Sequence, residues 1–255
     1  MNYPTLVEML QAGAHFGHQV SRWHPKMKPF IFSQRNGVHI IDLRQTLEQM
    51  QQVLPEIKKM AETGKIILFV STKPQAREIV KQAAVDCGMP YLVDRWLGGA
   101  LTNFDEIKKL IRKYVTLKEK QAKGEFDQYT KKEQLEIKRN LEKMGSYLEG
   151  LSSLTSMPDA VFMPSVQREK TALVEARKTD VPVIGICDTN ANPDKVDYVI
   201  CSNDDAVKSI EMMVRLVSGA IKEGRAEWEK KNQAQAKIGV VSEKAPESET
   251  KTESL

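Results

Sequence analysis

All four histidines of this 255-residue chain lie within its first 39 residues, at His15, His18, His24 and His39. The first three could hold a metal ion through their imidazole nitrogens. A closed zinc site takes four ligands, often including cysteine, and the first cysteine of the chain is Cys87. We therefore predict no resident metal. Weak zinc binding by His15, His18 and His24 stays open, beside the alternative of neutral, hydrogen-bonded histidines packed under a sheet.

The segment from residue 17 to residue 29 mixes cationic, aromatic and proline residues and lacks apolar periodicity. This predicts an extended loop, which could wrap phosphates with its cations and stack a base on its tryptophan or a histidine. A loop at a domain edge with a packed tryptophan explains the composition equally well. The candidate RNA- or partner-binding residues of the region are His15, His18, Arg22, Trp23, His24, Lys26 and Lys28.

Polar residues also follow three strand-like runs, at Ser71-Thr72-Lys73, at Ser165 and at Asp188-Thr189-Asn190. Parallel sheets bind ligands at the carboxyl ends of their strands, so these residues could hold a phosphate. The glycine-rich fingerprints of nucleotide-binding loops are absent from the sequence. Asp204-Asp205 indicates the acidic start of a helix. We predict no catalytic residue and keep one alternative, a nucleotide- or sugar-phosphate-using enzyme with a doubly wound α/β fold.

The composition favours an ordinary globular protein with a modest basic excess. Hydrophobic residues make up 41 %, charged residues 28 % and aromatic residues 6 %, and the net charge is +4. The longest apolar run, residues 66–70, is far shorter than the ~20 residues of a membrane helix, and no secretory signal is visible. The three cysteines lack CxxC spacing, which favours reduced thiols. We therefore expect a cytoplasmic protein without a membrane partner.

Strand-like runs alternate with helical periodicity along most of the chain, which predicts βαβ units and a parallel sheet. A hairpin is expected around the turn between residues 32 and 38, after a short helix at 5–12. The expected strands of the parallel sheet are 66–70, 91–93, 160–163, 182–187 and 198–200, and the expected helices are 42–62, 74–87, 168–178 and 203–222.

Residues 103–151 interrupt this alternation with two helical segments. Asn103 is a suitable N-cap, and apolar residues recur at spacings of three and four on both sides of a break at Gly124. This pattern predicts an antiparallel coiled-coil hairpin with a polar tip. Lys118, Lys120 and Lys123 form a candidate positive cluster near the tip, suited to a phosphate or an acidic protein surface. A solvated structural arm and a partner-binding arm are equally consistent with the pattern.

Four groups of residues resemble motifs of the bacterial ribosomal protein S2 family, in the right order over residues 3–225. Cys201-Ser202 departs from the Pro-Gly often found there in the family, which affects only the local turn. The matching motifs are Gly13-Ala14-His15-Phe16-Gly17-His18 with Trp23-His24-Pro25-Lys26-Met27, then Arg95-Trp96-Leu97-Gly98-Gly99 with Leu101-Thr102-Asn103, then Pro158-Asp159-Ala160, and finally Asp188-Thr189-Asn190 with Asn203-Asp204-Asp205-Ala206.

The resemblance implies a flavodoxin-like three-layer α/β/α domain with a parallel sheet and an inserted antiparallel coiled-coil hairpin. On this basis we expect residues 1–102 and 152–231 to form the α/β domain, 103–151 the hairpin and 232–255 a disordered charged tail. The resemblance also implies a non-catalytic component of the small ribosomal subunit. Its partners would be ribosomal RNA and neighbouring ribosomal proteins, including the large mRNA-binding one. Arg95, Trp96 and Asn103 of the central motif join the candidate binding residues.

Overall fold

The computed structural model describes residues 3–242, and its centre is a parallel five-stranded sheet. The strand order is β5-β4-β6-β7-β8. The first strand of this sheet, β4, lies next to one end of the row, and the second strand, β5, pairs with it as the edge strand. The remaining three strands are added in sequence order on the other side, which is the flavodoxin-like order. This confirms the predicted fold class. The strands are β4 (Ile67–Val70), β5 (Tyr91–Leu92), β6 (Ala160–Met163), β7 (Val183–Cys187) and β8 (Tyr198–Cys201).

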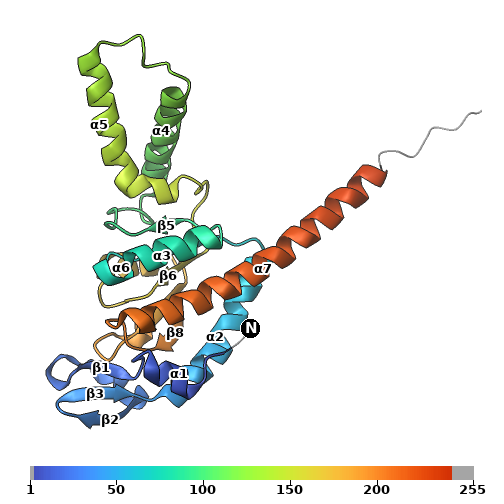
Figure 1. The fold of residues 1–255 in the computed structure, drawn as a ribbon. Helices are drawn as coiled ribbons and strands as arrows, with labels where there is room; N and C mark the ends of the chain where they lie inside the picture. Colours follow the sequence, from blue (N-terminus) through green and yellow to red (C-terminus); the bar gives the residue numbers. More distant parts are fainter. Residues whose placement is uncertain (1–2, 243–255) are drawn as a thin grey trace, which may run out of the picture.

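Helices cover both faces of this sheet because its strands are apolar on both sides (Figure 1). Ile67 and Phe69 of β4 pack on one face, with helices α2 (Leu43–Glu62), α3 (Pro74–Asp86) and α7 (Val207–Ser242). Leu68 and Val70 pack on the other, with α6 (Lys170–Lys178) and the base of the helical hairpin. The result is the expected three-layer arrangement.

The N-terminal residues form a second, three-stranded antiparallel sheet beside the body. Its order is β1-β3-β2, after a short helix α1 (Leu6–Gln11). Asn36 and Gly37, with φ of 51° and 74°, make the two-residue turn of the predicted hairpin. The strands are β1 (Phe16–Gln19), β2 (Ile31–Arg35) and β3 (Val38–Ile41).

The segment from residue 17 to residue 29 is not the extended loop that its composition predicts. It enters through β1, which pairs with β3, and continues through two 3-10 helices, η1 (Val20–Arg22) and η2 (Pro25–Phe30). Met27 is fully buried in the core, and the Nδ1 atom of His24 accepts a hydrogen bond from the backbone of Lys26 at 3.2 Å. The segment is thus held by strand pairing, a local cap and one buried side chain, although it has no apolar period of its own.

Helices α4 (Phe104–Ala122) and α5 (Lys131–Leu148) form an arm that projects from the β5 edge of the sheet (Figure 1). Buried side chains fix its base, namely Ile111, Tyr114, Leu141 and Leu148. Asn103 occupies the N-cap position of α4, but its side chain makes no capping hydrogen bond. A coiled-coil register along the whole arm stays a prediction.

Helix α7 is longer than predicted. The sequence pattern places its end near Lys222 and no fixed structure from residue 232, yet the helix continues to Ser242 and projects beyond the body (Figure 1). The expectation is therefore wrong for residues 232–242, and residues 243–255 lie outside the described part. Contacts after residue 222 support the helix as far as Glu227, because Arg225 Nη1 donates to the carbonyl of Cys87 at 3.3 Å and Lys58 Nζ lies 2.6 Å from Glu227. Within residues 3–242, no helix is long and apolar enough to cross a membrane.

Candidate functional site

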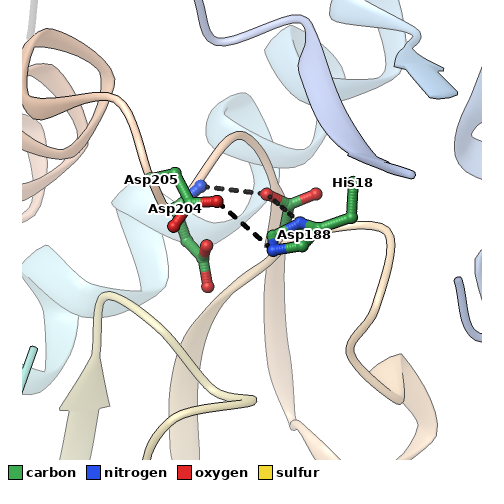
Figure 2. Close-up of side chains that lie close together, drawn as sticks. All are labelled: His18, Asp188, Asp204 and Asp205. Atoms are coloured by element: carbon green, nitrogen blue, oxygen red, sulfur yellow. Dashed lines mark hydrogen bonds and ion pairs between the residues drawn. The ribbon is translucent and has the colours of Figure 1, made fainter. Parts of the chain in front are cut away.

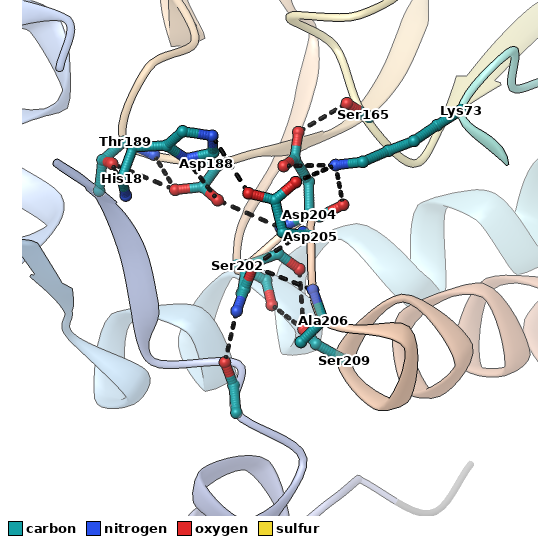
Figure 3. A network of polar contacts seen from close by, with 12 residues as sticks. His18, Lys73, Ser165, Asp188, Thr189, Ser202, Asp204, Asp205, Ala206 and Ser209 are labelled. Atoms are coloured by element: carbon teal, nitrogen blue, oxygen red, sulfur yellow. Dashed lines mark hydrogen bonds and ion pairs between the residues drawn. The ribbon is translucent and has the colours of Figure 1, made fainter. Parts of the chain in front are cut away.

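Four strands of the parallel sheet end at one edge, where their polar residues meet His18 of the N-terminal sheet (Figure 3). Lys73 follows β4, Ser165 follows β6, Asp188 follows β7, and Asp204 and Asp205 follow β8. These residues come from distant parts of the chain because parallel strands bring their carboxyl ends to the same edge. We call them, with His18 and Thr189, the edge cluster.

Lys73 is the central cation of the edge cluster. Its Nζ atom lies 3.0 Å from Asp204 Oδ1 and 2.7 Å from Asp205 Oδ1, and it also donates to the backbone carbonyl of Asp204. The other oxygen of Asp204 accepts a hydrogen bond from Ser165 Oγ at 2.6 Å. Because the side chain of Asp204 is only 4 % exposed, these partners replace the water that its charge has given up.

His18 joins the N-terminal sheet to this edge (Figure 2). Its Nδ1 atom lies 3.1 Å from Asp188 Oδ2, and its Nε2 atom lies 3.3 Å from Asp205 Oδ2. The backbone N–H of His18 donates to Thr189 Oγ1 at 2.8 Å, and the backbone N–H of His24 donates to the Thr189 carbonyl at 2.8 Å. The edge cluster therefore fastens the N-terminal sheet to the body.

The charges of the edge cluster shift one another's pKa values. The hydrogen bond with Asp188 raises the pKa of His18, although burial works against it. Burial also opposes the charge of Lys73, but Asp204 and Asp205 outweigh it and raise the pKa of Lys73. Burial and the nearby Asp188 raise the pKa of Asp204. Burial opposes ionisation of Asp205 as well, yet Lys73 and His18 leave its pKa lowered.

The edge cluster also contains a set of metal-type donors. One donor atom each from His18, Asp188, Asp204 and Asp205 lies within 4.8 Å of all the others. An imidazole with carboxylates suits a divalent transition metal. Lys73, however, already provides a cation against Asp204 and Asp205.

The histidines grouped by the sequence do not form a site together. Of the three, only His18 belongs to a group of metal-type donors among the described residues. The ring of His15 contacts that of Phe16, tilted by 38° with 4.0 Å between centroids, and burial lowers the pKa of His15. His24 uses its Nδ1 atom to cap η2. Zinc binding by His15, His18 and His24 as a trio is therefore not supported.

The basic residues of the N-terminal segment divide into paired and unpaired ones. Arg22 and Lys28 are exposed, and neither has an ion pair in the described part of the chain. Lys26 Nζ lies 2.7 Å from Asp194 Oδ2. Trp23 is half-buried, with its ring 5.2 Å from that of His39. Arg22 and Lys28 are thus the cations of this segment most available to a phosphate.

Glu175 of α6 anchors the loop of residues 95–103, the central motif of the sequence analysis. The sequence patterns did not single out Glu175. Its carboxylate accepts hydrogen bonds from Trp96 Nε1 at 2.9 Å and from the backbone of Gly99, Leu101 and Thr102 at 2.9 to 3.3 Å. Burial opposes the charge, but these bonds leave the pKa of Glu175 lowered. The Trp96 ring is thus anchored within the protein and half-buried, whereas Arg95 is exposed.

The predicted lysine cluster of the hairpin is dispersed. Lys118 points back toward the base, with Nζ 3.8 Å from Glu149 and 5.8 Å from the centre of the Tyr114 ring. Lys120 Nζ lies 3.9 Å from Glu125. Lys123 is exposed after the end of α4 and has no ion pair with the side chains that the structure describes, in residues 3–232.

The sequence analysis did not predict that the residues of the edge cluster lie together. It did identify polar residues after several predicted strands, which is the pattern that could have indicated the cluster. Asp204 and Asp205 are more than the acidic start of a helix, because α7 begins only at Val207 and both carboxylates face Lys73. The sequence did not reveal that Lys73, 131 positions before Asp204, supplies the counter-charge.

Comparisons with known proteins agree on one family. The model described as "Ribosomal protein S2" matches residues 9–224. Proteins named "Small ribosomal subunit protein uS2" are similar over most of their length. The one from Chlorobaculum tepidum is 46 % identical over 220 residues, 86 % of this chain and 88 % of the relative. The one from Helicobacter hepaticus is 47 % identical over 223 residues, 88 % and 84 % of the two chains. These comparisons do not support the enzyme alternative.

Proposed function

Since this chain belongs to the ribosomal protein S2 family, we propose that it acts as a structural, non-enzymatic component of the small ribosomal subunit. The observation that carries this proposal is the family match, which spans both halves of the α/β body and the hairpin between them. The protein accordingly works in the cytoplasm, on the ribosome, in translation.

Ribosomal RNA is the first class of partner in this proposal. The exposed, unpaired cations Arg22 and Lys28 support it, because phosphate contacts need charges that are not already neutralised. Arg95 offers a similar charge on the loop held by Glu175. His15, His18, Trp23, His24 and Trp96 serve mainly to hold these cations in place, since their rings pack or bond inside the protein.

Neighbouring ribosomal proteins are the second class of partner. Phe16 of β1 is 50 % exposed and Phe32 of β2 is 74 % exposed. Exposed aromatic side chains are typical of protein interfaces. We place a protein contact at this N-terminal sheet, and the large mRNA-binding protein of the subunit is the partner that the family resemblance implies.

The proposed structural role uses no cofactor. Added zinc would be coordinated by His18, Asp188, Asp204 and Asp205, and it would compete with the Lys73 ammonium group for the carboxylates. Titration with zinc chloride tests this placement, because His18→Gln should weaken zinc binding while His15→Gln should leave it unchanged. The reverse result would restore a site built on the other N-terminal histidines.

Sedimentation tests the proposed function. A tagged copy of the chain, expressed in its own cells, should migrate with the small subunit when the lysate is centrifuged in a magnesium-containing gradient. It should also copurify with small-subunit RNA. A chain found only in the free protein fractions, carrying a bound nucleotide or sugar phosphate, would overturn the proposal and favour an enzyme.

A further inference from the structure

The turn at the far end of the hairpin is fixed by several tethers rather than left loose. Gly124 reverses the chain with φ of 70°. Gln134 Nε2 donates to the carbonyl of Tyr129 at 3.0 Å and to that of Asp127 at 3.4 Å. Glu133 accepts the backbone N–H of Thr130 at 2.9 Å in a capping box. A solvated appendage needs no such order, so the tip has a defined shape to present.

An aromatic ring is displayed on this fixed turn. Tyr129 is 44 % exposed, and the ring of Phe126 lies 6.1 Å from its ring, centroid to centroid. Phe126 itself packs as part of the hairpin's apolar side. The tip that the sequence predicts to be polar therefore carries a supported aromatic side chain facing solvent.

Three exposed lysines flank this turn along the chain. Lys123, Lys131 and Lys132 are exposed, and none has an ion pair in the part of the chain that the structure describes. Lys131 and Lys132 are the first two residues of α5, where the positive end of the helix dipole disfavours cations. Their position is locally unfavourable to the fold, which points to an anionic partner outside it.

We propose that this surface, formed by Lys123, Tyr129, Lys131 and Lys132, binds a single-stranded segment of ribosomal RNA. The ammonium groups contact backbone phosphates, and the Tyr129 ring stacks on an unpaired base. A single RNA strand matches both features at once, because each nucleotide carries a phosphate beside a planar base. An acidic protein surface is the alternative that the crosslinking experiment below distinguishes. The inference rests on the proposed function and names a contact within it.

Competition for incorporation tests the lysines. The variant Lys131→Gln/Lys132→Gln is mixed with wild type and offered to small subunits that lack this protein. The matched control is Lys170→Gln/Lys178→Gln, which removes two exposed lysines without ion pairs from α6. We expect the tip variant to be under-represented in the subunits and the control to match wild type. Equal incorporation of tip variant and wild type would overturn the proposal.

The salt dependence of binding gives a second readout. The slope of log K against log salt is negative, and each single-strand phosphate that the protein no longer neutralises reduces its magnitude by ~0.7. The tip variant loses two lysines, so the magnitude should decrease by about 1.4. Tyr129→Ala should weaken binding about tenfold at fixed salt, and Tyr129→Phe should not, because stacking needs the ring and not the hydroxyl. An unchanged slope, or Tyr129→Ala binding as wild type does, would contradict the assignment.

Photo-crosslinking separates RNA from protein as the partner. A p-azidophenylalanine replaces Tyr129, and assembled subunits are irradiated. We expect an adduct that nuclease digestion removes. An adduct that only protease digestion removes, or no adduct in assembled subunits, would overturn the proposal. These outcomes differ from failure of the proposed function, in which the wild-type chain itself would not sediment with the small subunit.

Discussion

At the carboxyl edge of the sheet, Lys73 has two carboxylates within 3.0 Å, whereas at the hairpin tip Lys123, Lys131 and Lys132 have none among the described residues. The edge cluster lies at the junction of the body and the N-terminal sheet, and its lysine and histidine are paired with carboxylates inside the protein. The tip lies in solvent, and its lysines stay available. We infer from the difference that the first region holds the fold together, and it supports our proposal that the second binds a partner.

Removing the cation of the edge cluster should have the largest effect on stability. Lys73→Met leaves Asp204 buried, next to Asp188, without its counter-charge. We expect a decrease of ~3–5 kcal/mol in the free energy of unfolding, measured by urea denaturation. Lys170→Met on the exposed surface of α6 is the control and should change little. A decrease below about 1 kcal/mol for Lys73→Met would show that the edge cluster does not hold the fold.

Glu175 is a buried carboxylate that is stabilised by hydrogen-bond donors, in contrast to Asp204, whose partner is a lysine. Glu175→Gln removes an anion that accepts hydrogen bonds from Gly99, Leu101 and Thr102, and should cost ~1–3 kcal/mol. Hydrogen exchange of the backbone between residues 95 and 103 should become faster. Glu136→Gln on the exposed face of α5 is the control. Unchanged exchange in the loop would show that Glu175 is not its anchor.

His18 should make the stability of the edge cluster depend on pH. Its pKa in the folded protein is raised above the ordinary value of 6.5, so folding favours the protonated form. This contribution is complete below the unfolded pKa and disappears as the pH rises through the folded one. The stability difference between wild type and His18→Gln should therefore be largest below the unfolded pKa and shrink as the pH rises through the raised folded pKa, in denaturant unfolding. A difference that grows with pH would contradict this arrangement of charges.

The tip lysines should have the smallest effect on stability, and of opposite sign. Lys131→Gln/Lys132→Gln removes two cations from the positive end of α5 and should stabilise the protein by a few tenths of a kcal/mol. Thermal unfolding followed by circular dichroism measures this. A destabilisation of about 1 kcal/mol or more would mean that the tip lysines belong to the fold, as the lysine of the edge cluster does.

The parallel sheet could be predicted from the sequence because its strands are continuous apolar runs, as in Ile67–Val70, separated by periodic helices. The strand β1 could not be predicted, since Phe16–Gln19 has neither an apolar run nor apolar alternation and owes its conformation to pairing with β3. The first extra turns of α7, as far as Glu227, contact distant partners such as Lys58 and the carbonyl of Cys87. Local patterns do not contain such contacts.

The site was predictable only in part, for the same reason. Residue types identify the cations of the N-terminal segment, but not which of them are neutralised, and the ion pair of Lys26 with Asp194 separates it from Arg22 and Lys28. The hairpin lysines show the reverse case. Sequence proximity suggests a cluster of Lys118, Lys120 and Lys123, whereas helix geometry turns Lys118 toward Glu149.

The salt dependence of binding to small subunits that lack this protein tests the central claim most directly, since the claim is that unpaired outer cations hold the chain on ribosomal RNA. We compare wild type with the variant Arg22→Gln/Lys28→Gln/Lys131→Gln/Lys132→Gln. Removing four cations that each neutralise a phosphate should reduce the slope of log K against log salt by about 3, with folding unchanged by circular dichroism. A folded variant that binds with the wild-type slope would contradict the account.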